Sequence, residues 1–236
     1  MKKLIILLGF GILLSNQGWS QRDKQCVEVI KAYNNEIGKI QRPKGKQVYL
    51  IDYSTEIQYW DKYMPIQSFR TKMYMSEDYL HYFSDVVDIF SDPKYIATVL
   101  KDQKKIVFTL NGREENTFEN YQKMMKAKND ILDSASVVSC NMEENGNGKL
   151  ILDPSNLRIS NFYVKKLIYE YNHESGEVVK TVTEYSEQYD IRKMTVINHS
   201  NEFNSKYKGF KSVKKIFFKS SGELIDKYRN YEIIVD

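Results

Sequence analysis

The sequence is poor in the residues that define several classes of protein. Its 236 residues include eleven glycines, four prolines and two cysteines. So little glycine and proline excludes collagen-like and low-complexity disordered chains, and two cysteines cannot form a disulfide scaffold. The three histidines include no pair at the i, i+4 spacing of a zinc hydrolase. We therefore expect a chain that folds around an ordinary hydrophobic core.

Motifs of catalysis and cofactor binding are also missing. The sequence has no Gly-x-Ser-x-Gly elbow, no phosphate-binding Gly-Lys loop and no dinucleotide-binding Gly-x-Gly-x-x-Gly. Acidic pairs such as Glu114-Glu115 and Glu143-Glu144 are typical of solvated surfaces. We therefore expect no enzymatic activity, no metal and no cofactor.

The chain carries little net charge. Its 35 Lys and Arg against 31 Asp and Glu give +4, or +2 once Lys2 and Lys3 are removed with the first twenty residues. Nucleic-acid binding needs a basic patch that this balance does not supply. The densest basic stretch, Lys206–Lys219, alternates with apolar residues. It predicts a strand with one solvent-facing side, with contact to anionic lipid as the alternative.

No hydrophobic run is long enough to cross a membrane. The longest, Leu4–Leu14, spans about 16 Å as a helix, half of a bilayer core. It follows Lys2-Lys3 and precedes Gly18-Trp19-Ser20, the pattern of a secretory signal peptide. We expect residues 1–20 to be a cleaved signal peptide, leaving a soluble periplasmic or secreted protein with no transmembrane anchor.

Hydrophobic periodicity divides the exported chain into helices and strands. Apolar residues recur at helical spacing over Cys26–Ile40 and predict a helix that packs on a sheet. From Val48 to Tyr59 the period becomes two, which predicts a long strand whose apolar face carries Tyr49, Ile51, Tyr53 and Ile57. Short strands separated by polar pairs continue to Leu110, and more strands fill Ser136–Val235, including Val213–Lys219 and Leu224–Tyr228. The pattern predicts an antiparallel meander without a linker.

One helix interrupts this meander. Asn116 and Glu119 resemble a capping box, and an apolar stripe follows at helical spacing over Thr117–Ala135. The stripe includes Phe118, Tyr121, Met125 and Leu132. The helix is either a lid over a ligand cavity or a permanently docked core helix, and the sequence leaves both open.

The two cysteines, Cys26 and Cys140, also allow two interpretations. An exported protein meets an oxidising environment, where they can form a disulfide. Each also lies in an apolar stripe, where a free cysteine serves as a small buried hydrophobe.

Aromatic residues are the one abundant class. Without residues 1–20 the chain has 216 residues, of which 29 are aromatic and 18 of those are tyrosine. Tyrosine combines an apolar ring with a polar tip, which suits a β-core and also a pocket for a long apolar ligand.

The order of these elements resembles the periplasmic lipoprotein-carrier superfamily, the LolA/LolB-like fold. The matching parts are Met1–Ser20, Cys26–Ile40, Val48–Leu110, Asn116–Ala135 and Ser136–Val235. The resemblance is architectural, and it implies an unclosed barrel that holds acyl chains under a helical lid. Arg70, on a strand of the first half of the sheet, is a candidate for the carriers' characteristic arginine by position only, and it is not assigned to the site.

The predicted fold is mainly β (α+β): a strongly curved antiparallel sheet or unclosed barrel of about 10–12 strands. The N-terminal and mid-chain helices cover its concave face, and residues 21–236 form a single domain. The predicted function is non-catalytic binding of a lipid, a lipoprotein acyl chain or another hydrophobic ligand in a concave, aromatic-rich pocket. The candidate residues of the pocket or lid are Tyr49, Ile51, Tyr53, Ile57, Phe118, Tyr121, Met125 and Leu132. The alternative is an envelope-associated module that binds a protein partner through an edge strand or an aromatic face.

Overall fold

The computed structural model describes residues 24–39, 43–111, 117–142, 146–154 and 164–235. Within α2, side chains are described at 123 and from 126 onward. The predicted signal peptide, residues 1–20, lies outside the described residues.

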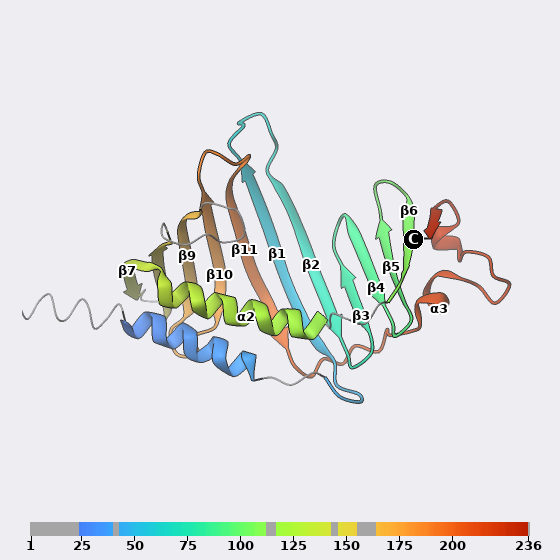
Figure 1. Ribbon diagram of the computed structural model, residues 1–236, viewed down its shortest axis with the longest axis horizontal. Helices are drawn as coiled ribbons and strands as arrows, with labels where there is room; N and C mark the ends of the chain where they lie inside the picture. Colours follow the sequence, from blue (N-terminus) through green and yellow to red (C-terminus); the bar gives the residue numbers. More distant parts are fainter. Residues whose placement is uncertain (1–23, 40–42, 112–116, 143–145, 155–163, 236) are drawn as a thin grey trace, which may run out of the picture. The chain divides into compact units, whose positions relative to one another are not determined.

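Twelve strands form one sheet in the order β12-β6-β5-β4-β3-β2-β1-β11-β10-β9-β8-β7 (Figure 1). The first six are β1 (Tyr49–Tyr59), β2 (Gln67–Met75), β3 (Leu80–Phe83), β4 (Val87–Ser91), β5 (Tyr95–Leu100) and β6 (Lys105–Leu110). The others are β7 (Ser136–Met142), β8 (Asn147–Asp153), β9 (Val164–Asn172), β10 (Val178–Tyr185), β11 (Ile191–Glu202) and β12 (Glu232–Val235). Because β12 and β7 end this order, the sheet is not closed, and the predicted fold class is confirmed.

The chain divides into two compact units. The first contains residues 1–40, 58–64 and 122–195, and the second contains 41–57, 65–121 and 196–236. The division passes through β1 and β11 and not through a linker, so both strands contribute to each unit. The single domain expected for residues 21–236 stays a prediction.

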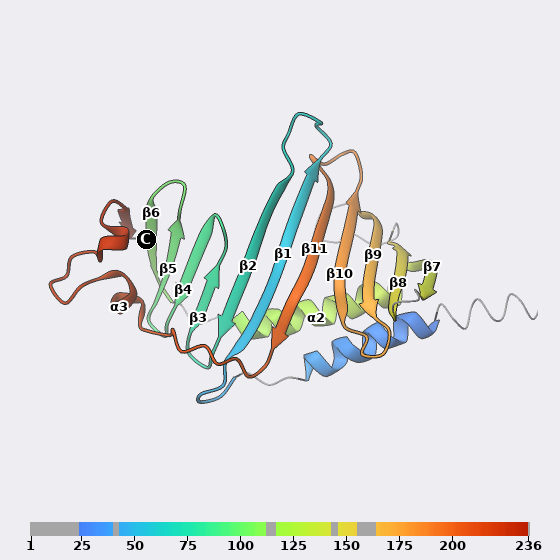
Figure 2. The same ribbon diagram turned by 180° about the vertical axis from the view of Figure 1, so that it is seen from behind.

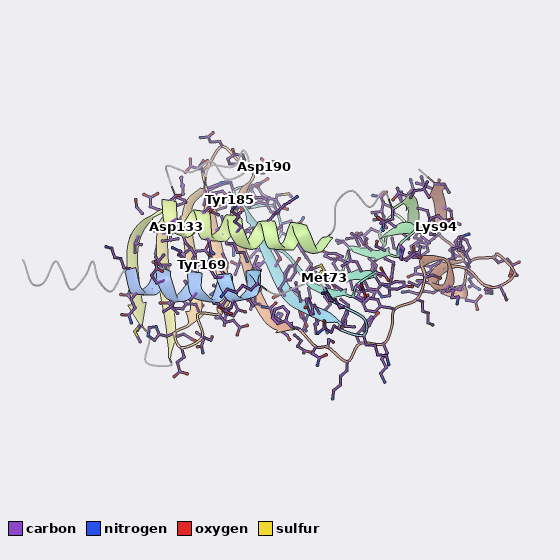
Figure 3. All side chains as sticks on the ribbon, turned by 60° about the horizontal axis from the view of Figure 1, so that its bottom comes forward. Met73, Lys94, Asp133, Tyr169, Tyr185 and Asp190 are labelled. Atoms are coloured by element: carbon purple, nitrogen blue, oxygen red, sulfur yellow. A yellow bond between two sulfur atoms is a disulfide. The ribbon has the colours of Figure 1, made fainter. Side chains whose placement is uncertain are left out.

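In the first unit two helices pack on one face of β8 and β9 (Figures 1 and 2). They are the helix of residues 24–38 and α2 (Thr117–Ser134). Ile30 and Leu132 from the helices join Leu150, Leu152 and Tyr169 in one buried cluster. Figure 3 shows the helices across the strand that carries Tyr169. Apolar burial therefore fixes both helices to the sheet.

Three further contacts hold this unit together. Cys26 and Cys140 form a disulfide between the N-terminal helix and β7. Between the helices, Asn34 Nδ2 donates to Asn129 Oδ1 at 2.9 Å, and Lys31 pairs with Asp133 at 2.6 Å. Asn34 is buried, so its bond to Asn129 satisfies an amide that water cannot reach.

Gly148 of β8 faces the ring of Tyr171, which is fully buried on the neighbouring strand. A Cβ built at Gly148 would overlap that ring. Glycine is therefore required here by space, because the aromatic ring occupies the volume where another side chain would begin.

In the second unit the segment after β11 covers one face of the sheet. It contains α3 (Val213–Phe217) and a 3₁₀ turn, η1 (Asp226–Tyr228), and ends in β12, which pairs parallel with β6. Figure 2 shows this segment running past the ends of β2, β3 and β4. It is anchored by Val213, whose N–H donates to Asp92 Oδ2 at 2.7 Å.

Two sequence predictions for this segment are wrong. Val213–Lys219, expected as a strand, contains α3, and Leu224–Tyr228, also expected as a strand, holds one isolated bridge and η1. Val213, Ile216 and Phe217 fall at i, i+3 and i+4, so one helical turn also puts them on a single face. Val213 and Phe217 are both buried there.

Replacing Gly148 with alanine should lower the free energy of unfolding by about 1–3 kcal/mol, because the added methyl group overpacks against Tyr171. Urea unfolding measures the change. Gly38→Ala is the matched control: no atom lies within 4 Å of the position that a Cβ would take there, and we expect no loss of stability. Equal losses from both variants would contradict the packing explanation.

Candidate ligand-binding face

The strand register of the second unit sorts its side chains onto two faces. One row of directly paired residues contains Ile51, Met73, Tyr82, Ile89, Thr98 and Val107. We call the face with this row the Ile89 face. The opposite face carries Tyr74, His81, Phe90, Ala97 and Phe108, which are paired in the same way. We call it the Phe90 face.

The Phe90 face is covered by the C-terminal segment. Phe90, Ala97, Val99 and Ile106 are buried in one cluster with Val213, Phe217 and Tyr228. The ring of Phe217 meets those of Phe90 and Phe108 edge to face at 5.4 and 5.3 Å. The C-terminal segment and this face together form the hydrophobic core of the second unit.

His81 lies in the same aromatic layer. Its Nδ1 is 2.8 Å from the Tyr207 hydroxyl, and its ring contacts Phe90 and Phe210. Its Nε2 is buried and has no hydrogen-bond partner among the described residues. Burial lowers the pKa of His81 to about 4, so the ring is neutral at pH 7.

The Ile89 face is equally apolar but incompletely covered. Met73, Tyr82, Ile89, Thr98 and Val107 are all half-buried. The opposite face instead buries His81, Phe90, Ala97, Val99 and Ile106, beside the half-buried Tyr74 and Phe108. A sheet with one solvated face normally alternates apolar and polar residues. Strands β4, β5 and β6 instead carry apolar residues on both faces, which is typical of strands covered on both sides. The Ile89 face is therefore the candidate ligand-binding face.

Between β2 and β5, the described residues of the Ile89 face include no charged side chain. Its polar groups are hydroxyls: Thr71 Oγ1 lies 3.4 Å from the Tyr82 hydroxyl, and Tyr53 is next to both. Burial raises the pKa of Tyr53, so its hydroxyl stays neutral at pH 7. Such a surface suits a neutral hydrocarbon chain.

The structure places the four predicted strand residues on this face. Tyr49 and Ile51 are 5% and 8% exposed, whereas Tyr53 and Ile57 are half-buried. The Tyr49 ring meets Phe203 edge to face at 5.2 Å. Tyr49 and Ile51 are thus core residues in this structure, and Tyr53 and Ile57 have more accessible surface.

The four predicted helix residues cannot be grouped in the same way. The side chains of Phe118, Tyr121 and Met125 lie outside the described residues. Leu132 is 3% exposed in the core of the first unit, so the helix is docked at that end. Whether the other end acts as a lid stays a prediction.

Sequence reasoning missed the part of the face that lies on β3–β6. The signal was the lack of alternation in Tyr95–Leu100 and Lys105–Leu110, where apolar residues occupy consecutive positions. Such runs indicate strands buried on both faces. These runs were interpreted as ordinary meander strands, and β1 was the one strand assigned to the site, together with residues of the mid-chain helix.

An ion-pair cluster lies on the opposite side of β1 and β2. Asp52 is 5% exposed and accepts from Arg70 Nε and Nη2 at 2.8 and 2.7 Å, with Lys72 Nζ at 3.5 Å. The hydrogen bond from Arg70 holds the pKa of Asp52 below its usual range. This geometry neutralises a buried carboxylate, so Arg70 has a structural partner.

Within the described residues, no three His, Cys, Asp or Glu side chains gather closely enough to hold a metal ion. None of the helices described there combines the length and apolar character that crossing a membrane requires.

The neutral state of His81 predicts a pH-dependent stability. The unfolded chain binds a proton near pH 6.5 and the folded chain only near pH 4. The contribution of His81 to stability should therefore be fully present above about pH 7 and fall by up to about 3 kcal/mol as the pH decreases from 6.5 to 4. Urea unfolding of wild type and His81→Phe at pH 7 and 4.5 measures this.

The His81→Phe variant should lose clearly less stability than wild type between these two pH values. His199→Gln is the control, because His199 is exposed and its loss should leave the wild-type profile nearly unchanged. A His81→Phe profile as steep as that of wild type would refute the assignment.

Comparison with known proteins finds similarity in structure alone. No protein-family model matches the chain, and no curated protein matches it in sequence. A conserved protein from Thermus thermophilus is 6% identical with a TM-score of 0.41, covering 87% of this chain and 97% of its own. A DUF1329 family protein from Desulfovibrio piger is 7% identical with a TM-score of 0.35, covering 84% and 99%. A LolA superfamily protein from Nitrosomonas europaea is 9% identical with a TM-score of 0.31, covering 83% and 98%.

Proposed function

We propose that this protein binds the hydrocarbon chain of a lipid or lipoprotein on the Ile89 face, without catalysis, after export to the periplasm. The observation that carries the proposal is the second apolar face of β3–β6. One apolar face is buried under the C-terminal segment, and the other remains half-exposed. A ligand chain would remove this second face from water. The free energy of binding would then become more favourable by about 25 cal/mol for each Å² of apolar surface buried.

The chemistry of the face favours a neutral chain over a charged ligand. Lys105 on β6 pairs with Glu232 on β12, and its Nζ lies 3.8 Å from Glu232 Oε2. The hydroxyls of Tyr53, Thr71 and Tyr82 lie at the β1–β3 end. They can donate to an ester or amide oxygen, while the aliphatic residues of β4–β6 accept the hydrocarbon.

Export is supported by two features of the chain. The predicted signal peptide directs it out of the cytoplasm, and the Cys26–Cys140 disulfide fits an oxidising compartment. The bridge joins residues 114 positions apart.

A protein-binding module is the second candidate. Edge strand β7 exposes Val138 and Met142, at 61% and 62%, and such a strand can pair with an extended segment of another protein. The test below distinguishes the two candidates, since β7 belongs to the first unit and the Ile89 face to the second.

Titration with dansyl-labelled undecanoic acid tests the lipid proposal. We expect saturable binding with enhanced fluorescence, weakened about tenfold in Ile89→Gln, because a carboxamide there loses apolar contact and needs hydrogen bonds that a hydrocarbon cannot supply. Val138→Gln is the matched control on β7 and should bind as wild type does.

Thr98→Val is a second variant on the same face, and it separates an effect on binding from a loss of folding. It keeps the size of the side chain and makes the face more apolar, so binding should be unchanged or tighter. Absence of binding by the folded wild-type protein, or equal weakening by Ile89→Gln and Val138→Gln, would leave the protein-binding module as the better proposal.

A further inference from the structure

The loop that joins β1 to β2 presents large apolar side chains to solvent. Trp60, Tyr63 and Met64 are 37%, 84% and 45% exposed. Three such residues lie within five positions, and packing in a hydrophobic core does not account for their exposure. Figure 1 shows the loop at the same end of the strands as the β10–β11 turn, residues 186–190.

Hydrogen bonds fix the loop that carries these side chains. The Trp60 backbone N–H donates to Asp190 O at 2.8 Å, and the indole Nε1 donates to Ser186 O at 3.3 Å. Within the loop, Asp61 Oδ1 accepts from the Tyr63 N–H at 2.8 Å. Figure 3 labels Asp190 at this end of the first unit. The exposure of Trp60 and Tyr63 is therefore built into a hydrogen-bonded loop.

Cations accompany each exposed ring. Lys62 Nζ lies 5.1 Å from the Tyr63 ring centre. Lys165 Nζ and the Arg192 guanidinium carbon lie 5.7 and 5.6 Å from the Trp60 ring. At these distances a cation is attracted by an aromatic ring, and its stem covers apolar surface while the charged end stays in water.

Acidic groups in the same two loops balance these cations. The three acidic residues Asp61, Glu187 and Asp190 equal in number the three basic residues Lys62, Lys165 and Arg192. The Asp61 carboxylate is directed at the loop's own backbone. Long-range attraction to an anionic surface is therefore weak, and apolar insertion has to supply most of any binding energy.

We propose that the segment Trp60–Met64 is a membrane-contact loop that inserts its aromatic rings into the headgroup region of a lipid bilayer. Tryptophan and tyrosine favour this region because it accommodates an apolar ring and a polar tip together. Lys62, Lys165 and Arg192, placed over the rings, then lie at the level of the lipid phosphates, to which they are complementary in charge. This inference is independent of what the Ile89 face binds.

The test uses the chain from Gln21, which contains every described residue and has Trp60 as its only tryptophan. The probes are vesicles of phosphatidylethanolamine and phosphatidylglycerol at 3:1, and vesicles of phosphatidylcholine alone. We expect the Trp60 emission to shift to shorter wavelength with both, and brominated lipid to quench it. Partitioning should be only a few-fold stronger with the anionic vesicles.

The double variant Tyr63→Ser, Met64→Ser should weaken partitioning about tenfold, because it removes apolar surface that inserts. The control is Val138→Ser, Met142→Ser, which removes two side chains of comparable exposure from β7 and should partition as wild type does. The proposal is overturned if wild type fails to bind either vesicle, if Trp60 emission does not shift, or if both double variants weaken binding equally. Failure to bind vesicles would assign the loop to contact with a protein instead.

Discussion

The central constraint on this molecule is that β4, β5 and β6 are apolar on both faces. Strands of this kind are typically covered on both sides, because each apolar face gains free energy when it is removed from water. The chain supplies one layer itself. Its C-terminal segment brings Val213, Phe217 and Tyr228 onto Phe90, Val99 and Ile106. The Ile89 face keeps its partial exposure, and the function we propose follows from that asymmetry.

The two units meet the need for cover in different ways. In the first, two helices cross the strands, and Cys26–Cys140, Lys31–Asp133 and Asn34–Asn129 fix them there. The opposite face of the same strands mixes the ion pairs Lys180–Glu170 and Lys166–Glu184 with the apolar row Ile151, Ile168 and Val182. The charged side chains make part of that face compatible with water. In the second unit, β4 and β5 have no such ion pairs on the Ile89 face, which is why we propose ligand binding there.

Much of the fold could be predicted from the sequence because period-two and helical patterns are local. Alternation predicted a strand over Val48–Tyr59, and β1 is Tyr49–Tyr59; the helices that begin near Cys26 and Thr117 followed from apolar stripes. The C-terminal segment could not be predicted in the same way. Val213, Ile216 and Phe217 suit a strand or a helical turn equally, and only their packing on Phe90 and Phe108 selects the helix.

The site was predicted in part for a related reason. Alternation in β1 correctly placed Tyr53 and Ile57 on the same face as Ile51, but it carries no information on how much of each side chain is covered. Exposure depends on what the rest of the chain packs against, so buried Tyr49 and half-buried Tyr53 looked equivalent. The pairing of Ile89 with Tyr82 and Thr98 follows from strand register, which a single sequence does not reveal.

Photolabelling tests the central claim most directly. A fatty acid with a diazirine on its hydrocarbon chain is bound to the folded protein and activated by light, and the labelled residues are then identified by mass spectrometry. The account predicts labels on Met73, Tyr82, Ile89 and Val107, and none on Phe90, Ala97 or Ile106, which the C-terminal segment covers. Labels concentrated on the Phe90 face, or on the helices of the first unit with none on the Ile89 face, would contradict it.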